Sequence, residues 1–474
     1  MSELILGPIV GGLSSSGANL WGRASAPGVL HAWLGQQPDL SDARLVATSL
    51  PLAAQDGFAG VAPLSNLLPD TRYYYALSLE EVPPDPTRGP YSGFTTFPAS
   101  DDPYSFNFAM GSCFRPATAE SGQIFSAIDQ QRLKDNLCFI LLTGDQIYAD
   151  AYQYNGLGKI ACTLDEYRKV YEYTWSRPPF RKLLFNLPAF MTLDDHEVDD
   201  DWTWTDSSRT SARIPIWDRV ERYLKGRPLE ERRLSTSRVQ AALQAYWEHQ
   251  GMHSPHFVNP LRLNAMGQYG LSPDDPGSLA YTFTFGAAAF FVLDTRSMRV
   301  KSRRGKTMLG EGQWRALETW LLTVKDRFPV KFLITSCALL FQMWADFPRD
   351  RWTGFPEERS RLLNFIASNG IEGIYLLAGD LHSAHAISAE LEGPLGKPVP
   401  LWEFCATPFD QAPNTLSRST YWPIRKKPLL TEVLHFVAQQ NNYGMVRVSF
   451  DASGKPAVHY EVYGENGDLL AKVG

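Results

Sequence analysis

Residues 137–148 are Leu-Cys-Phe-Ile-Leu-Leu-Thr-Gly-Asp-Gln-Ile-Tyr, so that an apolar run ends directly in a polar turn. The run from Leu137 to Leu142 predicts a buried strand. Residues 106–110 predict another strand, and residues 121–134, between the two, have a helical pattern. Together the three segments predict a βαβ unit, in which the two strands are parallel.

Strands and helices continue to alternate after this unit. Further strands are expected at residues 189–193, 280–285, 288–293, 331–335 and 373–378, and helices at residues 164–173, 237–249, 312–325 and 357–367. Residues 444–450 and 458–463 predict a closing hairpin. This alternation is typical of the α/β fold class, in which the carboxyl ends of the strands form the ligand crevice.

The first hundred residues have a different pattern. Short extended runs at 18–23, 29–34 and 45–51 are separated by turn residues and predict a small β-sandwich. Residues 66–75 resemble the leucine-x-proline-x-threonine-x-tyrosine corner of fibronectin type III domains. We therefore predict a fibronectin III-like β-sandwich over residues 1–100, a linker at Asp101-Asp102-Pro103, and an α/β domain over residues 105–474.

Four of the expected strands end in polar turns. These turns are Gly111-Ser112-Cys113, Gly144 to Tyr148, Asp194 to Glu197, and Gly379 to His382. A single Asp after a strand is more often a cap or turn residue. Four such turns favour a metal site, because converging carboxylates repel one another unless cations lie between them. Carboxylates suit Ca²⁺, Mg²⁺ or Mn²⁺, whereas Cys113, Tyr148 and His382 suit Fe³⁺ or Zn²⁺.

Residues 194–201 are the most acidic stretch, with six carboxylates in eight residues. Such a stretch is either a solvated loop or a metal site. The apolar run at 188–193, directly before it, favours the metal site. His196 in this stretch is either a general acid or a structural histidine, and the sequence leaves both open.

Two arginines are candidates for binding substrate phosphate, because a guanidinium group matches two phosphate oxygens. Arg115 follows Cys113, and Arg296 follows the strand expected at 288–293. Each is equally compatible with a structural ion pair, which is the interpretation we favour for Arg296. A basic run comes next, formed by Arg299, Lys301, Arg303, Arg304 and Lys306. Such a run is usually a solvated loop, and here it would also attract phosphorylated substrates.

Six segments together resemble the PhoD-like alkaline phosphatases, a branch of the calcineurin-like metallophosphatases. They are GSC, LLTGDQIYAD, LDDHEVDDDW, VLDTRSMR, RDRWTGFPEER and LLAGDLH, in that order along the chain. The resemblance implies a four-layer αββα metallophosphatase sandwich and the hydrolysis of phosphate esters. It also implies Fe³⁺ beside Ca²⁺, with Zn²⁺, Mn²⁺ and Mg²⁺ as alternatives.

The resemblance also implies roles for individual residues. Cys113 and Tyr148 would bind Fe³⁺, and Asp145 would bridge metals. Asp380 and His382 would form the last ligand pair. Asp200 and Asp201 stand where the family usually has asparagines. Asp195 and Asp200 are predicted as further metal ligands, while the choice among Asp194, Asp195 and Asp200 stays open.

Composition excludes several classes of protein. With 474 residues, 44% of them hydrophobic and 20% charged, the chain is neither disordered nor a coiled coil. A net charge of −6 argues against general affinity for nucleic acids or anionic membranes, local patches excepted, and we predict no stable nucleic-acid partner. No apolar stretch approaches the roughly 20 residues that cross a bilayer. Five cysteines without paired spacing, and an N-terminus without an export signal, predict a cytoplasmic protein.

These features predict an enzyme, namely a metal-dependent alkaline phosphomonoesterase or phosphodiesterase acting on small-molecule phosphate esters. A phospholipase-D-like diesterase is one alternative, because pocket shape rather than metal ligation decides which ester fits. The altered middle motif motivates an alternative from another class, a noncatalytic binding protein stabilised by metals.

Overall fold

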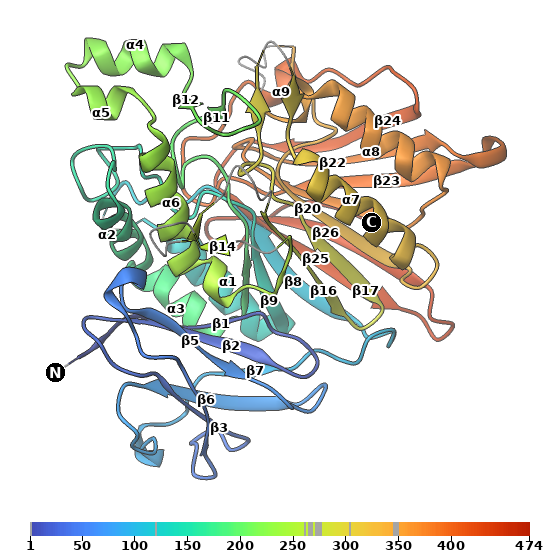
Figure 1. The fold of residues 1–474 in the computed structure, drawn as a ribbon. Helices are drawn as coiled ribbons and strands as arrows, with labels where there is room; N and C mark the ends of the chain where they lie inside the picture. The colour runs from blue at the N-terminus through green and yellow to red at the C-terminus, as the bar shows by residue number, and fades with distance from the viewer. Residues whose placement is uncertain are drawn as a thin grey trace.

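The computed structural model describes residues 2–118, 121–259, 262–263, 269–270, 277–302, 305–344 and 350–474. Arg303 and Arg304 of the predicted basic run lie outside the described residues. Two large β-sheets pack face to face, with helices on the outer side of each (Figure 1). None of the described helices is long and apolar enough to cross a membrane.

Each large sheet is mixed. Within the described residues, the first sheet has six strands in the order β10 (Ala189–Met191), β9 (Leu137–Leu142), β8 (Phe106–Gly111), β25 (Asn442–Phe450), β26 (Pro456–Gly464) and β27 (Leu469–Val473). The second, counted over the same residues, has eight strands in the order β13 (Phe257–Asn259), β16 (Ser278–Phe285), β17 (Ala288–Val292), β20 (Val330–Cys337), β21 (Ile374–Gly379), β23 (Pro398–Cys405), β22 (Ala384–Glu392) and β24 (Leu429–Ala438). Strands β8 and β9 pair in parallel and are connected through helix α1 (Gln123–Asp135), which confirms the predicted βαβ unit.

Helices complete the layers. The first sheet is covered by α1, α2 (Leu164–Trp175), α3 (Pro178–Asn186) and α6 (Thr236–His249), and the second by α7 (Gly310–Val324) and α8 (Pro356–Ser368). Helix α2 begins with a capping box, because the Thr163 hydroxyl accepts from the Glu166 N–H while the Glu166 carboxylate accepts from the Thr163 N–H. The smaller elements are α4 (Ile216–Leu224), α5 (Leu229–Arg232), α9 (Ser417–Thr420), β11 (Thr203–Trp204), β12 (Ala212–Arg213), β14 (Arg262–Leu263), β15 (Tyr269–Gly270), β18 (Val300–Lys301) and β19 (Lys306–Thr307).

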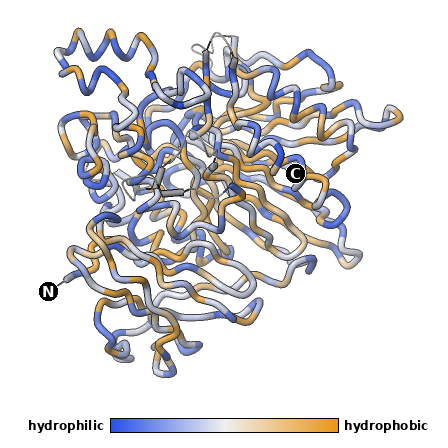
Figure 2. Tube along the Cα trace, in the orientation of Figure 1, coloured by the Kyte–Doolittle hydropathy of each residue, from blue (hydrophilic) through white to orange (hydrophobic). Residues whose placement is uncertain are grey.

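Aromatic side chains fill the space between the two sheets. The Phe108 and Phe139 rings of the first sheet stack at 4.8 Å, and the Phe290 and Phe332 rings of the second also stack at 4.8 Å. Phe108 meets Phe332 edge to face at 5.4 Å. Figure 2 shows hydrophobic residues concentrated along these central strands. The strands are therefore held rigidly, and the turns at their carboxyl ends inherit that rigidity.

The N-terminal segment forms two smaller sheets. In the described residues their orders are β1 (Leu4–Gly11), β2 (Ala18–Ala24), β5 (Ala59–Leu64) and β4 (Arg44–Thr48), β3 (His31–Gly35), β6 (Arg72–Ser78), β7 (Gly93–Thr95). Their core continues into the helical layer, because the Trp21 indole N–H donates to the Glu248 carbonyl at 2.8 Å and its ring meets Trp175 at 5.8 Å. The segment expected as a linker is tied down, with Asp101 paired to Arg327 at 2.8 Å. The N-terminal sheets thus share their packing with the rest of the chain.

Candidate metal centre

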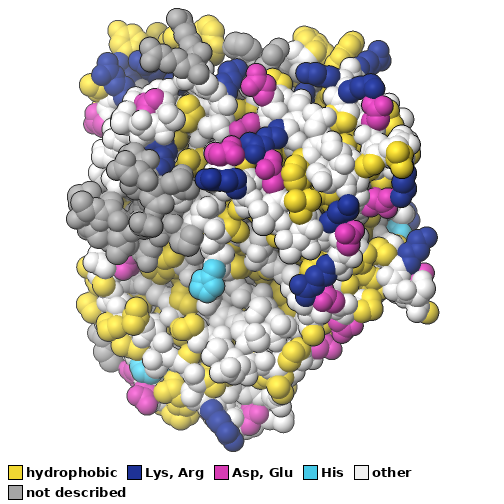
Figure 3. All heavy atoms as spheres, turned by 45° about the vertical axis from the view of Figure 1, so that its right-hand side comes forward, with side chains coloured by type: hydrophobic (Ala, Val, Ile, Leu, Met, Phe, Trp, Pro, Cys, Tyr) yellow, Lys and Arg dark blue, Asp and Glu magenta, His cyan; other side chains and the backbone are white. Residues whose placement is uncertain are grey.

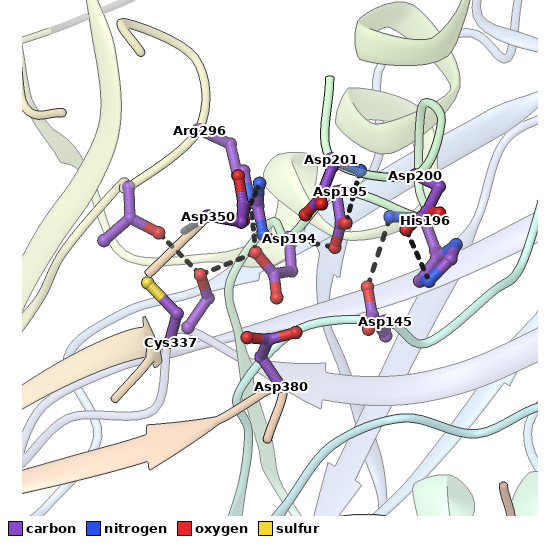
Figure 4. A network of polar contacts seen from close by, with 12 residues as sticks. Asp145, Asp194, Asp195, His196, Asp200, Asp201, Arg296, Cys337, Asp350 and Asp380 are labelled. Carbon is purple, nitrogen blue, oxygen red and sulfur yellow. Dashed lines mark hydrogen bonds and ion pairs between the residues drawn. The ribbon is translucent and has the colours of Figure 1, made fainter. Parts of the chain in front are cut away.

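The four polar turns lie together at the carboxyl ends of β8, β9, β10 and β21, and Figure 4 shows side chains from the turns after β9, β10 and β21. Three groups of side chains place their ligand atoms within 4.8 Å of one another, and these groups are Asp145, Asp195 and His196; Asp194, Asp195 and Asp380; and Asp195, Asp201 and Asp350. Asp195 belongs to all three groups. Figure 4 shows it between Asp145 and His196 on one side and Asp194 and Arg296 on the other.

A second set of predicted ligands lies beside Asp145. The Cys113 Sγ and the Tyr148 hydroxyl each lie 3.4 Å from the Asp145 Oδ2 atom. The Tyr148 hydroxyl is 3.3 Å from His382 Nε2. The Thr407 hydroxyl donates to the Cys113 Sγ at 3.1 Å, which fixes the orientation of the thiol. A thiol, a phenol, an imidazole and a carboxylate therefore meet in one place, the donor set that suits a transition metal.

The backbone holds several of these residues in an unusual conformation. The φ angles are 64° at Cys113, 55° at Asp145, 49° at Asp201, 65° at Asp380 and 54° at His382. Residues with a Cβ rarely adopt this left-handed region, and such residues cluster at functional sites. Cys113, Asp145 and Asp380 turn the chain sharply just after their strands end, while Asp201 lies in the loop between β10 and β11.

Glu197 ties two of the turns together. Its buried carboxylate accepts hydrogen bonds from the backbone N–H groups of Asp145 at 3.2 Å, Gln146 at 2.8 Å and Asp194 at 3.0 Å. Burial nevertheless raises the pKa of Glu197 to about 7. The turn after β9 and the turn after β10 are consequently fixed relative to each other by one side chain.

Arg296 is placed behind the carboxylates and away from solvent. Its guanidinium group is fully buried and pairs with Asp194, with Asp195 at 3.3 Å and with Asp350 at 2.7 Å. Arg299 pairs with the same Asp350 at 2.6 Å. The geometry is that of a structural ion-pair network, since no face of Arg296 is open to a ligand. Arg299 was expected in a solvated basic loop, and that expectation is wrong because the side chain is fully buried.

His196 lies at the edge of the centre. Its Nδ1 is 2.8 Å from Asp150 Oδ1, and its Nε2 is 3.7 Å from Asp200 Oδ1. Although burial opposes protonation, Asp150, Asp195 and Asp145 raise the pKa of His196 well above its usual value. Burial likewise opposes ionisation of Asp150, but attraction from His196 and Arg222 lowers the pKa of Asp150 to about 2. In the metal-free protein these carboxylates therefore favour the protonated form of His196.

A cavity of about 410 Å³ opens onto the centre. Its lining includes Asp195, His196, Arg351, His382 and Asn414. Arg351 donates to Asp380 Oδ2 at 2.9 Å. Arg115, predicted as a phosphate clamp, is not among the lining residues; its guanidinium stacks on the Tyr154 ring at 4.4 Å.

Three residues of the site escaped the sequence interpretation, namely Asp150, Asp350 and Arg351, and Asp201 was named without a role as a ligand. Asp350 and Arg351 stand in the segment RDRWTGFPEER, which was used only as a family signature. Asp201 belongs to the acidic stretch, and Asp150 follows Tyr148 by two positions. Only their position within the motif segments could have indicated these residues, because their spacing does not distinguish them from other charged residues. Asp200, by contrast, belongs to none of the three ligand groups found in the described residues.

The donor set fits bound cations. Burial raises the pKa of Asp194 to about 8 and that of the Cys113 thiol to about 12. The Asp194 Oδ2 atom is buried without a hydrogen-bond partner. A buried carboxylate oxygen that lacks a donor costs free energy, and a cation at that point removes the cost.

Comparison with known proteins agrees with this geometry. Residues 108–455, which make up most of the chain, match the family model for the PhoD-like phosphatases. The chain belongs to the PhoD-like phosphatase family. The resemblance inferred from the six segments is thus confirmed. Alkaline phosphatase D of Bacillus subtilis (strain 168) is 27% identical over 253 residues, which cover 48% of this chain and 37% of that relative.

Solved structures share the fold. A structure of PhoD is 20% identical with a TM-score of 0.69, over 99% of this chain and 92% of that one. A purple acid phosphatase from yellow lupin (Lupinus luteus) seeds is 11% identical with a TM-score of 0.59, over 98% of this chain and 73% of that one. The metallophosphatase fold predicted from the sequence is therefore confirmed for this member of the PhoD-like phosphatases.

We expect metal binding to this PhoD-like phosphatase to release protons. A thiol with a pKa of about 12 and a carboxyl group with a pKa of about 8 are both protonated at pH 7 in the metal-free protein. Because metals bind the deprotonated forms, the apparent affinity rises by up to about tenfold per pH unit for each proton lost. Calorimetric titration in two buffers of different ionisation enthalpy measures this release. An affinity that is flat between pH 6 and pH 8 would contradict the prediction.

Proposed function

We propose that the protein hydrolyses small-molecule phosphate esters in a metal-dependent reaction. The observation that carries the proposal is that three groups of metal-binding side chains share Asp195 at the edge of an open cavity. Cations held this closely supply charge neutralisation of a phosphoryl group and an activated water when bound. Family membership and the fold support the same conclusion.

We propose Fe³⁺ and Ca²⁺ as the metals. Cys113, Tyr148 and Asp145 would hold Fe³⁺, because a thiolate and a phenolate suit a transition metal. His382 adjoins this set through Tyr148. Asp194, Asp195 and Asp380, which supply only carboxylate oxygens, would hold Ca²⁺. Elemental analysis tests this assignment together with a visible spectrum, in which a tyrosinate band is expected if Tyr148 binds iron.

Three side chains in and around the cavity would bind the substrate, hold the ligands and protonate the leaving group. Arg351 would bind substrate phosphate, because its guanidinium lines the cavity beside Asp380. Arg296 would act as a positioning residue that holds Asp194 and Asp195. His196 would protonate the leaving group from Nε2, since Asp150 holds Nδ1.

The decisive experiment is hydrolysis of p-nitrophenyl phosphate and bis-p-nitrophenyl phosphate by the full chain. We expect turnover of at least one substrate, its loss in the presence of a chelator, and its return when Fe³⁺ and Ca²⁺ are restored together. The ratio of the two rates separates monoesterase from diesterase activity. Metal-loaded protein with no chelator-sensitive turnover of either substrate would leave the noncatalytic binding protein as the better interpretation.

The role of His196 has its own test. We expect His196→Asn to lower kcat about 100-fold for phenyl phosphate esters and less than about tenfold for p-nitrophenyl esters, because a good leaving group departs without a proton. Asp150→Asn serves as the matched variant and should show a smaller loss with the same leaving-group dependence. Equal losses on both substrates would assign His196 to structure instead.

We also propose that residues 1–100 form a fibronectin III-like sandwich and residues 105–474 the metallophosphatase domain. The Tyr73 hydroxyl accepts from the Leu68 N–H at 3.1 Å, which supports a tyrosine corner of the kind that β-sandwiches use. The five cysteines are free. Free thiols support the reducing, cytoplasmic location that we propose.

A further inference from the structure

Helix α4 carries its apolar side chains outward, while Arg222 and Asp218 face inward. It lies at the edge of the molecule, away from both large sheets (Figure 1). Five large apolar side chains are exposed, and their exposed fractions are 65% for Ile216, 68% for Trp217, 44% for Val220, 65% for Tyr223 and 77% for Leu224. Leu229 of α5 adds a sixth at 50%. We call these six residues the α4 ridge.

The inward face of α4 fixes the orientation of the helix. Arg222 is buried and donates to the Asp199 carboxylate at 2.9 Å and to the Glu231 carbonyl at 2.9 Å. Asp218 lies on the same side, where burial raises its pKa to about 6. Turning the ridge inward would break the buried Arg222–Asp199 pair, which is costly because the remaining charge stays buried. The ridge is therefore held in its exposed position.

Basic residues surround the α4 ridge. Arg213, Arg219, Lys225 and Arg233 are exposed and Arg227 and Arg232 are half-buried, against the exposed acids Glu221 and Glu230 and the half-buried Asp218. Lys225 pairs with Glu221, and Arg227 pairs with Glu231 at 3.6 Å. This surplus of positive charge stands on a chain whose net charge is −6. On the face turned forward in Figure 3, by contrast, basic and acidic side chains are interspersed. A helix with Trp and Leu on one face and Lys and Arg at its flanks has the character of one that lies in a membrane interface.

We infer that the α4 ridge docks on the surface of a lipid bilayer that contains anionic headgroups. The apolar side chains would enter the headgroup boundary while the flanking cations meet the lipid charges. A second copy of this chain fits the surface less well, because two positively charged rims would face each other across the contact.

The inward face of α4, opposite the ridge, is close to the metal centre. Arg222 Nη2 lies 4.0 Å from Asp150 Oδ2, and Asp150 contacts His196. Docking through α4 would thus bring the cavity near the bilayer surface, where phosphate esters of lipids are concentrated. This last step rests on the proposed function, whereas the docking itself does not.

Vesicle flotation of the full chain tests the docking. The vesicles are phosphatidylcholine alone or equal parts of phosphatidylcholine and phosphatidylglycerol. We expect binding to the anionic vesicles and a decrease with added salt, because screening weakens the headgroup attraction. The double variant Trp217→Ser/Leu224→Ser should lower the partition coefficient about tenfold or more. Arg219→Glu/Arg233→Glu should lower it on anionic vesicles only.

Leu133→Ser/Leu322→Ser is the matched control, since these two leucines are also exposed on helices, at 71% and 51%. It should bind vesicles like the unaltered chain. All variants should hydrolyse soluble p-nitrophenyl esters at the unaltered rate, which separates a failure of docking from a failure of the proposed function. Absence of vesicle binding, or binding that the α4 variants leave unchanged, would overturn the inference. A dimer in solution that Trp217→Ser/Leu224→Ser dissociates would also overturn it, because a second copy would then cover the ridge.

Discussion

Replacing Asp195 by Asn should lower kcat about 1000-fold on the best substrate, the largest effect we expect from any single substitution. Asp195 is shared by all three groups of metal-binding side chains. An amide at this position removes a negative charge that all three groups share and replaces one of the two carboxylate oxygens by an NH₂ group, which cannot bind a cation. Elemental analysis of the purified variant should show less than the full metal content, and steady-state kinetics measures the loss of turnover.

Asp200→Asn is the matched control for that substitution. Asp200 lies five positions after Asp195, and Asp200→Asn is the same chemical change. The Asp200 side chain is 41% exposed, and it belongs to none of the ligand groups among the described residues. We expect full metal content and a change in kcat of less than about tenfold. If Asp200→Asn loses metal while Asp195→Asn retains it, Asp200 is the ligand and our assignment is reversed.

The second large effect concerns stability. We expect Glu197→Gln to reduce the free energy of unfolding by about 3 kcal/mol, because three buried backbone N–H groups lose part of their acceptor. In the variant, the side-chain NH₂ group, which is a donor, would face backbone N–H groups that donate to a carboxylate oxygen in the unaltered protein. The turns after β9 and β10 would then separate, so metal content should fall as well. Urea denaturation and elemental analysis measure the two consequences.

Glu403→Gln provides a control with the same chemistry at another place. The buried Glu403 carboxylate accepts from the backbone N–H groups of Leu339 at 2.6 Å, Leu340 at 2.8 Å and Phe341 at 3.0 Å. This variant should lose similar stability yet keep its metals, because its three donors carry no ligand. Equal metal loss in both variants would mean that Glu197 acts through global stability alone.

Much of the metal centre was predictable from the sequence. Cys113, Asp145, Asp195 and Asp380 each follow an apolar run, and that local pattern requires no knowledge of the sheet. Parallel strands bring their carboxyl ends to one edge, so turns that are distant along the chain were expected to meet. Strands β22, β23 and β24 were not predicted, because exposed residues, among them Pro398 and Pro400 in β23, interrupt their buried positions.

Other features depended on contacts that no local pattern encodes. Arg296 reads equally well as a phosphate clamp or as an ion-pair residue until Asp194 and Asp350 are seen around it. The segment at 101–103 reads as a linker until Arg327 is found to pair with Asp101. Ion pairs between distant residues leave no periodic signal, since each partner is compatible with solvent exposure as far as its own neighbours are concerned.

The sequence by itself determined the fold class, the family and the identity of most ligand turns, because these depend on hydrophobic periodicity and on residues adjacent in the chain. Only the tertiary structure decided which carboxylates lie close enough to share a cation and that Asp350 lies beside Asp195. It alone also showed that α4 turns its apolar face outward, because the Arg222–Asp199 pair holds the opposite face in the interior. Both outcomes follow from where buried charges find partners, and those partners are assembled by the packing of the sheets and helices.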